Sequence, residues 1–183
     1  APPDVLTTLA HPWRHEALIR ILAWREISGR YRGSLLGSLW PLLTPLLMLG
    51  VHTLVFGVIA PTRWPGAQEQ GIGMFALRLL AGMVVHGLLA EVLSRAPTLV
   101  TSQPNYVTKV VFPLEALGWV SLLTALFHTA MALLVLIVLN GVLGTGLSWS
   151  LLALPAILLP YALLLLGLAW LIAALGVYLR DLA

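Results

Sequence analysis

Long hydrophobic runs alternate with short polar stretches along this chain, and four of the runs are long enough to cross a membrane. They cover about residues 35–60, 73–93, 113–143 and 149–178. A membrane-spanning helix needs roughly 20 consecutive apolar residues. The last two runs exceed that length, so we expect those helices to be tilted, kinked or partly interfacial. The pattern predicts an all-α integral membrane protein.

A basic segment precedes the first hydrophobic run. It holds five arginines: Arg14, Arg20, Arg25, Arg30 and Arg32. Over residues 13–28, helical periodicity gathers Leu18, Ile21 and Leu22 on one side, a moderate amphipathic pattern. We therefore predict a helix that lies along the membrane surface, with simple basic anchoring as the alternative.

Glycine and proline positions predict how the chain enters the first span. Gly29 and Gly33 would let it turn up from the basic segment, because glycine adopts backbone conformations closed to other residues. Pro41 and Pro45 are expected to break backbone hydrogen bonds inside the span and to kink it near its inner end.

Basic residues are distributed unevenly between the two sides of the predicted spans. The N-terminal arginines, Arg95, Lys109 and Arg180 fall on one side, against Arg63 on the other. Because basic residues accumulate in cytoplasmic loops, both termini are predicted to be cytoplasmic. Arg78 lies near the outer end of the second span, where its side chain could reach the interface or, alternatively, contact an anionic substrate.

Composition narrows the function. Of 183 residues, 60% are apolar and 9% are charged, and the mean hydropathy is +0.97, values that a water-soluble domain could not bury. The net charge of +3 points to anionic lipid headgroups rather than to nucleic acid. The chain has no cysteine, hence no disulfide or thiolate metal site. Its sequence also lacks the phosphate-binding loop, the HExxH helix and the GxSxG elbow, so we expect neither an enzyme nor a metal site.

Three separated motifs point to one family. The first, Trp24 to Ile59, carries Arg25, Glu26, Arg30, Tyr31, Arg32, Gly33, Ser34, Leu36, Gly37, Leu39, Trp40, Pro45, Phe56 and Gly57. The second, Asn105 to Leu117, carries Lys109, Phe112 and Pro113, and the third is YLRDL, Tyr178 to Leu182. In this order they resemble the membrane subunit of type-2 bacterial ABC exporters, which move the cell-envelope polysaccharides O-antigen, capsule and teichoic acid.

The resemblance implies an architecture and partners. Residues 1–183 would form a single transmembrane permease domain, with a cytoplasmic interface helix at 13–28 and a coupling helix at 96–103. Members of the family have six spans, of which this sequence shows four. Two copies would form a pore in the bacterial inner membrane. A separate homodimeric ATPase would bind ATP and Mg²⁺, leaving this permease chain without a cofactor.

The resemblance and the residue types together suggest roles for three groups of residues. Coupling to the ATPase would involve Arg95, Pro104, Asn105, Lys109, Phe112 and Pro113. The interface and membrane anchor would comprise Trp24, Arg25, Glu26, Arg30, Tyr31 and Arg32. Aromatic faces suit sugar rings, so candidates for the path of a lipid-linked glycan are Tyr31, Trp40, Trp119, Tyr161 and Trp170. The alternative for each aromatic is packing or an interfacial belt.

Three histidines inside the predicted spans support rival functions. His52, His86 and His128 could mark a proton- or metal-coupled secondary transporter, because ionisable groups at membrane depth often line such pathways. None of these three histidines belongs to an HxxxH or HxxE pairing, so neutral histidines hydrogen-bonded between helices are the simpler interpretation. Glu91 lies four residues before Arg95, a spacing that predicts an ion pair on one helix. A non-transporting membrane scaffold is a further alternative that would leave the motifs unexplained.

Overall fold

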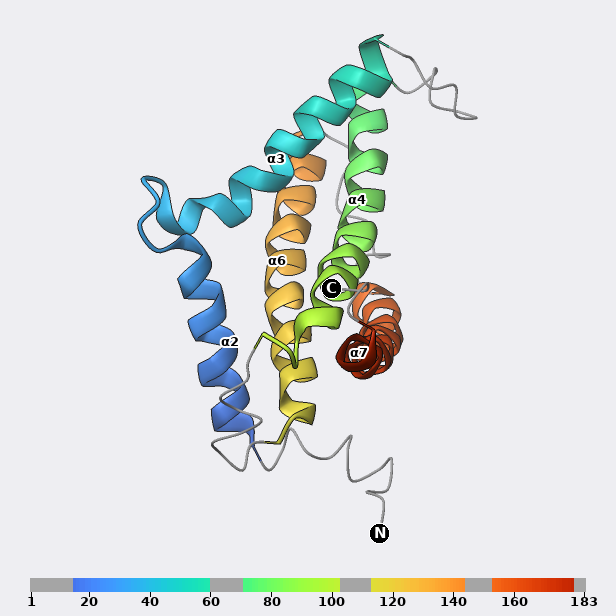
Figure 1. Cartoon of the computed structure of the whole chain (residues 1–183). Coiled ribbons are helices and arrows are strands. Elements are labelled where there is room, and N and C mark those ends of the chain that lie inside the picture. Colours follow the sequence, from blue (N-terminus) through green and yellow to red (C-terminus); the bar gives the residue numbers. More distant parts are fainter. Residues whose placement is uncertain (1–14, 60–70, 103–112, 144–152, 180–183) are drawn as a thin grey trace. The chain divides into compact units, whose positions relative to one another are not determined.

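The fold is helical throughout the part of the chain that the structure describes. A computed structural model describes residues 15–59, 71–102, 113–143 and 153–179, and no strand occurs among them. The α-helices are α2 (Glu16–Tyr31), α3 (Trp40–Thr53), α4 (Gly71–Arg95), α6 (Glu115–Val142) and α7 (Leu154–Tyr178) (Figure 1). Shorter elements are the 3₁₀ turns η1 (Gly37–Leu39) and η3 (Ala96–Thr98) and the π-helical segment η2 (Leu54–Ile59).

Four helices in the described ranges are long and apolar enough to span a membrane. They are Trp40–Ile59, Gly71–Thr98, Glu115–Val142 and Leu154–Tyr178, of 20, 28, 28 and 25 residues. Only 6% to 28% of each spanning window is buried against protein, which leaves most of the apolar surface for lipid or for another chain. The predicted all-α membrane fold with four apolar helices is confirmed.

The start of the first span differs from the prediction. The helix begins at Trp40, and Pro41 lies in its first turn, where the missing N–H would have no partner within the helix. The expectation that Pro41 breaks a hydrogen bond was therefore wrong. Pro45 lies inside the helix and does remove one. The π-helical segment that follows, η2, was not predicted.

The basic segment continues as a helix further than predicted. α2 extends to Tyr31, so Gly29 is helical and does not form the turn expected of it. Gly33 and Gly37 have φ angles of +80° and +47°, the left-handed region that favours glycine. Gly33 therefore lies in the turn that follows α2, as its sequence position predicted.

The predicted coupling helix at residues 96–103 takes a different form over its described part. Residues Ala96–Thr98 form a 3₁₀ turn directly after α4. The amide N of Ser102 then donates to the carbonyl O of Thr98 at 2.9 Å. Residues 96–102 thus continue α4 as turns and form no separate α-helix.

The chain divides into two compact units, and α4 and α6 contribute to both. The first unit contains α2 up to Arg30, α4 from Leu89 onward, η3, α6 up to Leu126 and α7 from Pro155. The second contains the chain from Tyr31 to Leu88, including α3, and the rest of α6. In the second unit Leu49 of α3 packs with Leu80 and Val84 of α4 and with Val135 of α6. A separate apolar cluster in the first unit joins α2 to α6.

Candidate functional site

The helix α2 packs one apolar face on protein. Its buried residues Ile19, Leu22 and Ala23 cluster with Ala116 and Val120 at the start of α6. Burial of this face removes apolar area from solvent at roughly 25 cal/mol per Å² and fixes α2 against α6. The sequence pattern did not predict this contact with α6.

Leu18, Ile21 and Leu22, which were predicted to lie on one side of that helix, differ in how far they are exposed. Leu22 is buried and Leu18 packs beside it on α6, whereas the side chain of Ile21 is 65% exposed. Trp24, three residues later, is 66% exposed. An exposed tryptophan beside basic residues is typical of a membrane interface, so Ile21 and Trp24 form the part of α2 left for lipid or a partner.

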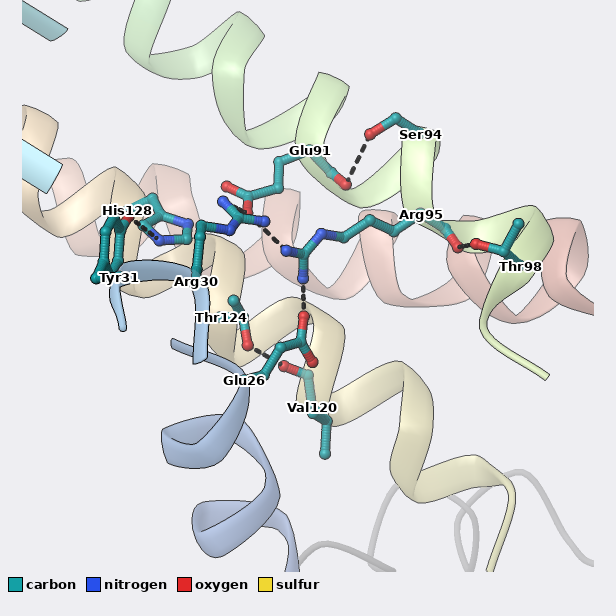
Figure 2. Close-up of polar contacts among 10 residues, drawn as sticks. All are labelled: Glu26, Arg30, Tyr31, Glu91, Ser94, Arg95, Thr98, Val120, Thr124 and His128. Atoms are coloured by element: carbon teal, nitrogen blue, oxygen red, sulfur yellow. Dashed lines mark hydrogen bonds and ion pairs between the residues drawn. The ribbon is translucent and has the colours of Figure 1, made fainter. Parts of the chain in front are cut away.

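Four charged side chains connect α2 to the end of α4, and we call them the arginine–glutamate relay: Glu26, Arg30, Glu91 and Arg95. A guanidinium N of Arg30 donates to Glu91 Oε1 at 3.0 Å, and Arg95 Nη2 lies 3.6 Å from the same oxygen. Arg95 also pairs through Nη1 with Glu26 on α2 (Figure 2). The charges alternate in sign along the relay, and their sum is zero. The predicted Glu91 and Arg95 ion pair is present.

The relay is less exposed than an ordinary surface pair. The side chains of Glu91 and Arg95 are 17% and 23% exposed, and those of Arg30 and Glu26 are 39% and 38% exposed. Glu16 and Arg20, an ordinary surface pair, are 61% and 75% exposed. Exposed ion pairs contribute about 0–1 kcal/mol. Partly buried pairs are screened less by solvent, and removing one partner strands the other charge. We therefore expect the relay to fix α2 on α4 more firmly than its distances alone suggest.

The turn after α4 is held closely against α7. Ala96 and Pro97 are buried, and Thr98 Oγ1 donates to the carbonyl O of Arg95 at 3.1 Å. A Cβ added at Gly176 of α7 would lie 2.3 Å from the carbonyl O of Pro97. Only glycine permits so close an approach of a helix to backbone, so Gly176 fixes the position of η3.

The start of α6 is also tied to α7. Trp170 Nε1 donates to the carbonyl O of Glu115 at 3.2 Å, and a Cβ at Gly118 would lie 2.3 Å from the same nitrogen. The rings of Trp119 and Trp170 meet edge to face with centroids 6.4 Å apart. Both segments that flank residues 103–112 therefore pack on α7 within one unit.

The structure brings together two of the five aromatic residues proposed for a glycan path, Trp119 and Trp170. The N–H of Trp170 is used by the backbone of α6, whereas Trp119 Nε1 is buried and has no hydrogen-bond partner in the described residues. In the second unit Trp40 Nε1 donates to Ser34 Oγ, and Tyr31 is bonded to a histidine. Tyr161 is half-buried in α7.

Two of the three histidines have defined hydrogen bonds. His128 Nε2 lies 2.9 Å from the hydroxyl of Tyr31, which joins two helices as predicted. His52 Nδ1 donates to the carbonyl O of Met48 at 2.8 Å, a bond within its own helix rather than between helices. The side chain of His86 is exposed. In the described residues, no group of three or more histidine, aspartate and glutamate side chains could hold a metal ion.

The remaining predicted residues are described in part. Arg95 lies in the relay, and the carbonyl O of Pro113 accepts from the amide N of Ala116 at 2.9 Å. Pro104, Asn105, Lys109 and Phe112 fall outside the described residues. Of the anchor group, Arg25 and Arg32 are exposed, as is Arg78 on α4.

Sequence analysis missed two features of the site. It did not pair Arg30 with Glu91, which lies 61 residues away, because no local spacing signals such a contact. It also gave no role to Gly176, which is one of several glycines in apolar helices.

Nearly the whole chain is similar to known proteins. Residues 17–183 match the family described as "ABC-2 type transporter". The chain is also 28% identical over 170 residues to the O-antigen export system permease protein RfbA of Myxococcus xanthus, covering 93% of this chain and 62% of that protein. The chain thus spans less than two thirds of that relative's length. No solved structure matches it.

Proposed function

Because this chain belongs to the family of ABC-2 type transporters, we propose that it is the transmembrane subunit of an ATP-driven exporter of lipid-linked polysaccharide. The family match over residues 17–183 carries the proposal, and the apolar helices make it a multi-pass membrane protein. Similarity to an O-antigen export permease favours O-antigen over capsule or teichoic acid as the cargo.

The energy for export comes from a separate ATPase in this proposal. The chain has no phosphate-binding loop, so ATP and Mg²⁺ would be bound by a homodimeric partner, and two copies of the permease would assemble with it. A polar glycan needs a hydrated path between such copies, because hydroxyl groups stranded in hydrocarbon cost several kcal/mol each.

Coupling would occur through residues 95–112. Arg95 and η3, at the start of this loop, and Glu115 and Trp119, after it, all lie in the first unit. That unit also contains α2 up to Arg30. A force applied to the loop would reach helices on both sides of it. The arrangement supports the loop as the input from the ATPase, and the exposed face of α2 with Trp24 as its membrane anchor.

Substitution in the loop tests this function. In the complete permease, replacing Pro104 and Asn105 by glycine should leave assembly with the ATPase intact but uncouple hydrolysis from export, since the loop would no longer transmit its displacement. The measurements are copurification of the ATPase, its ATP hydrolysis, and surface polysaccharide in the same cells. Normal export by this variant would contradict the coupling role, and absence of any copurifying ATPase would contradict the exporter itself.

A further inference from the structure

The arginine–glutamate relay connects two segments that the proposed function uses for different tasks. Glu26 and Arg30 belong to α2, the proposed interface helix, while Glu91 and Arg95 end α4 directly before the coupling loop. Glu91 receives both arginines, and Arg95 contacts both glutamates. Glu91 and Arg95 of α4 therefore each pair with one residue of α2, Glu91 with Arg30 and Arg95 with Glu26 (Figure 2).

Apolar packing alone would not fix this connection. The contact of α2 with Ala116 and Val120 of α6 is made by apolar side chains, and hydrophobic contact is non-directional. Ion pairs with hydrogen-bond geometry specify which residues meet. Sliding α2 by one turn would place like charges together or leave partly buried charges without partners, which is strongly unfavourable.

We propose that the relay makes α2 and the end of α4 a single rigid lever, with Glu91 as its positioning residue. When the ATPase displaces the coupling loop, the interface helix moves together with the end of α4 and keeps its position on it. This inference rests on the proposed function, because it names the element that carries the motion produced by ATP.

The absence of cysteine in this sequence allows a direct test by spin labelling. Ala17 on α2 and Ala90 on α4 are exposed, take no part in the relay, and lie in the same unit. Each is replaced by cysteine and labelled in the complete permease. The distance between the two labels is then measured by double electron–electron resonance. The samples are the permease alone and its complex with the ATPase, and the complex is measured both without nucleotide and with ATP trapped.

Labelled copies are mixed with an excess of unlabelled permease, so that the distance measured is the one within a single copy. The rigid lever predicts that this distance is narrow and is the same in all these states. In the variant Glu91→Gln the distance distribution should broaden, and export per ATP hydrolysed should fall about fivefold or more, within the range usual for coupling between sites. The matched control is Glu16→Gln, which breaks the exposed ion pair between Glu16 and Arg20 within α2. It should change neither the distance distribution nor the export per ATP hydrolysed.

Two results would overturn the lever. One is a change of the label distance on trapping ATP in the permease with an intact relay, which would show that α2 moves on α4. The other is a distribution that Glu91→Gln leaves as narrow as before. If this variant does not fold, the first measurement still decides. If no ATPase binds, the proposed function fails, while the comparison of the permease alone with and without the substitution still tests the relay.

Discussion

At the scale of single residues, glycine decides how closely α7 approaches its neighbours. Gly176 faces the backbone of Pro97 and Gly118 faces the indole of Trp170, and in each case an added Cβ would lie 2.3 Å from an atom of the neighbour. The two contacts differ in kind. A tryptophan side chain can rotate away, whereas the carbonyl of Pro97 moves only if η3 moves with it.

We therefore predict that Gly176→Ala destabilises the protein, by about 1–3 kcal/mol, the usual cost of overpacking. The matched control is Gly167→Ala on the same helix, where an added Cβ meets nothing within 4 Å. Alanine favours a helix over glycine by about 1 kcal/mol, so the control should be neutral or stabilising. Thermal unfolding in detergent measures both. Equal unfolding temperatures for the two variants would show that the close approach at Gly176 does not contribute to stability.

At the scale of elements, the irregular first span is the feature with a mechanical consequence. Pro45 lies inside α3 and removes a backbone hydrogen bond, and the helix then changes to a π-helical form at Leu54–Ile59. π-helical segments leave the regular hydrogen-bond pattern and often occur at functional positions. Thr53 Oγ1 lies just before the change, buried and without a hydrogen-bond partner in the described residues.

Replacing Pro45 by alanine should stabilise α3 and slow export. The new amide could donate to the carbonyl O of residue 41, and an interior proline costs a helix about 3 kcal/mol. A straighter, stiffer span would resist the movement that opens a path. The comparison variant is Pro41→Ala, because the amide at position 41 lies in the first turn and would gain no partner within the helix. Unfolding temperature and export rate are measured for both, and undiminished export by Pro45→Ala would exclude flexibility at this position as a requirement.

The elements also show what could be predicted from the sequence. The four spans and the turn at Gly33 follow from local signals, namely uninterrupted hydrophobic runs and a glycine after a basic helix. The exposure of Ile21 could not be predicted, since residues close in a helical projection were separated by where α6 packs. The pairing of Arg30 with Glu91 depends on contact between distant segments, and a single sequence contains no signal for it. The role of Pro41 depends on which residue begins the helix α3. Sequence patterns locate a helix start only to within a few positions.

At the scale of the whole molecule, the distribution of charge predicts orientation in the membrane. Arginines lie before the first span, and Arg95 and Lys109 lie between the second and third, whereas the predicted outer loops contain Arg63. Basic residues near span ends hold their loops on the cytoplasmic side. The relay pairs Arg30 and Arg95 with carboxylates, whereas Arg32 on the same side is exposed.

Single cysteines in this cysteine-free sequence test that orientation. We expect Gln68→Cys and Ser148→Cys, in the two predicted outer loops, to react in intact spheroplasts with a thiol reagent that does not cross membranes. Ser28→Cys on α2 and Ser102→Cys after η3 should react only after the membrane is permeabilised. The reason is electrostatic, because transferring the arginine-rich N-terminal segment across the membrane is opposed both by the membrane potential, at about 2.3 kcal/mol per charge per 100 mV, and by anionic lipid on the inner surface. Labelling of Ser28→Cys in intact spheroplasts would place α2, the relay and the coupling loop on the side without ATP, and an ATPase could then not act on them.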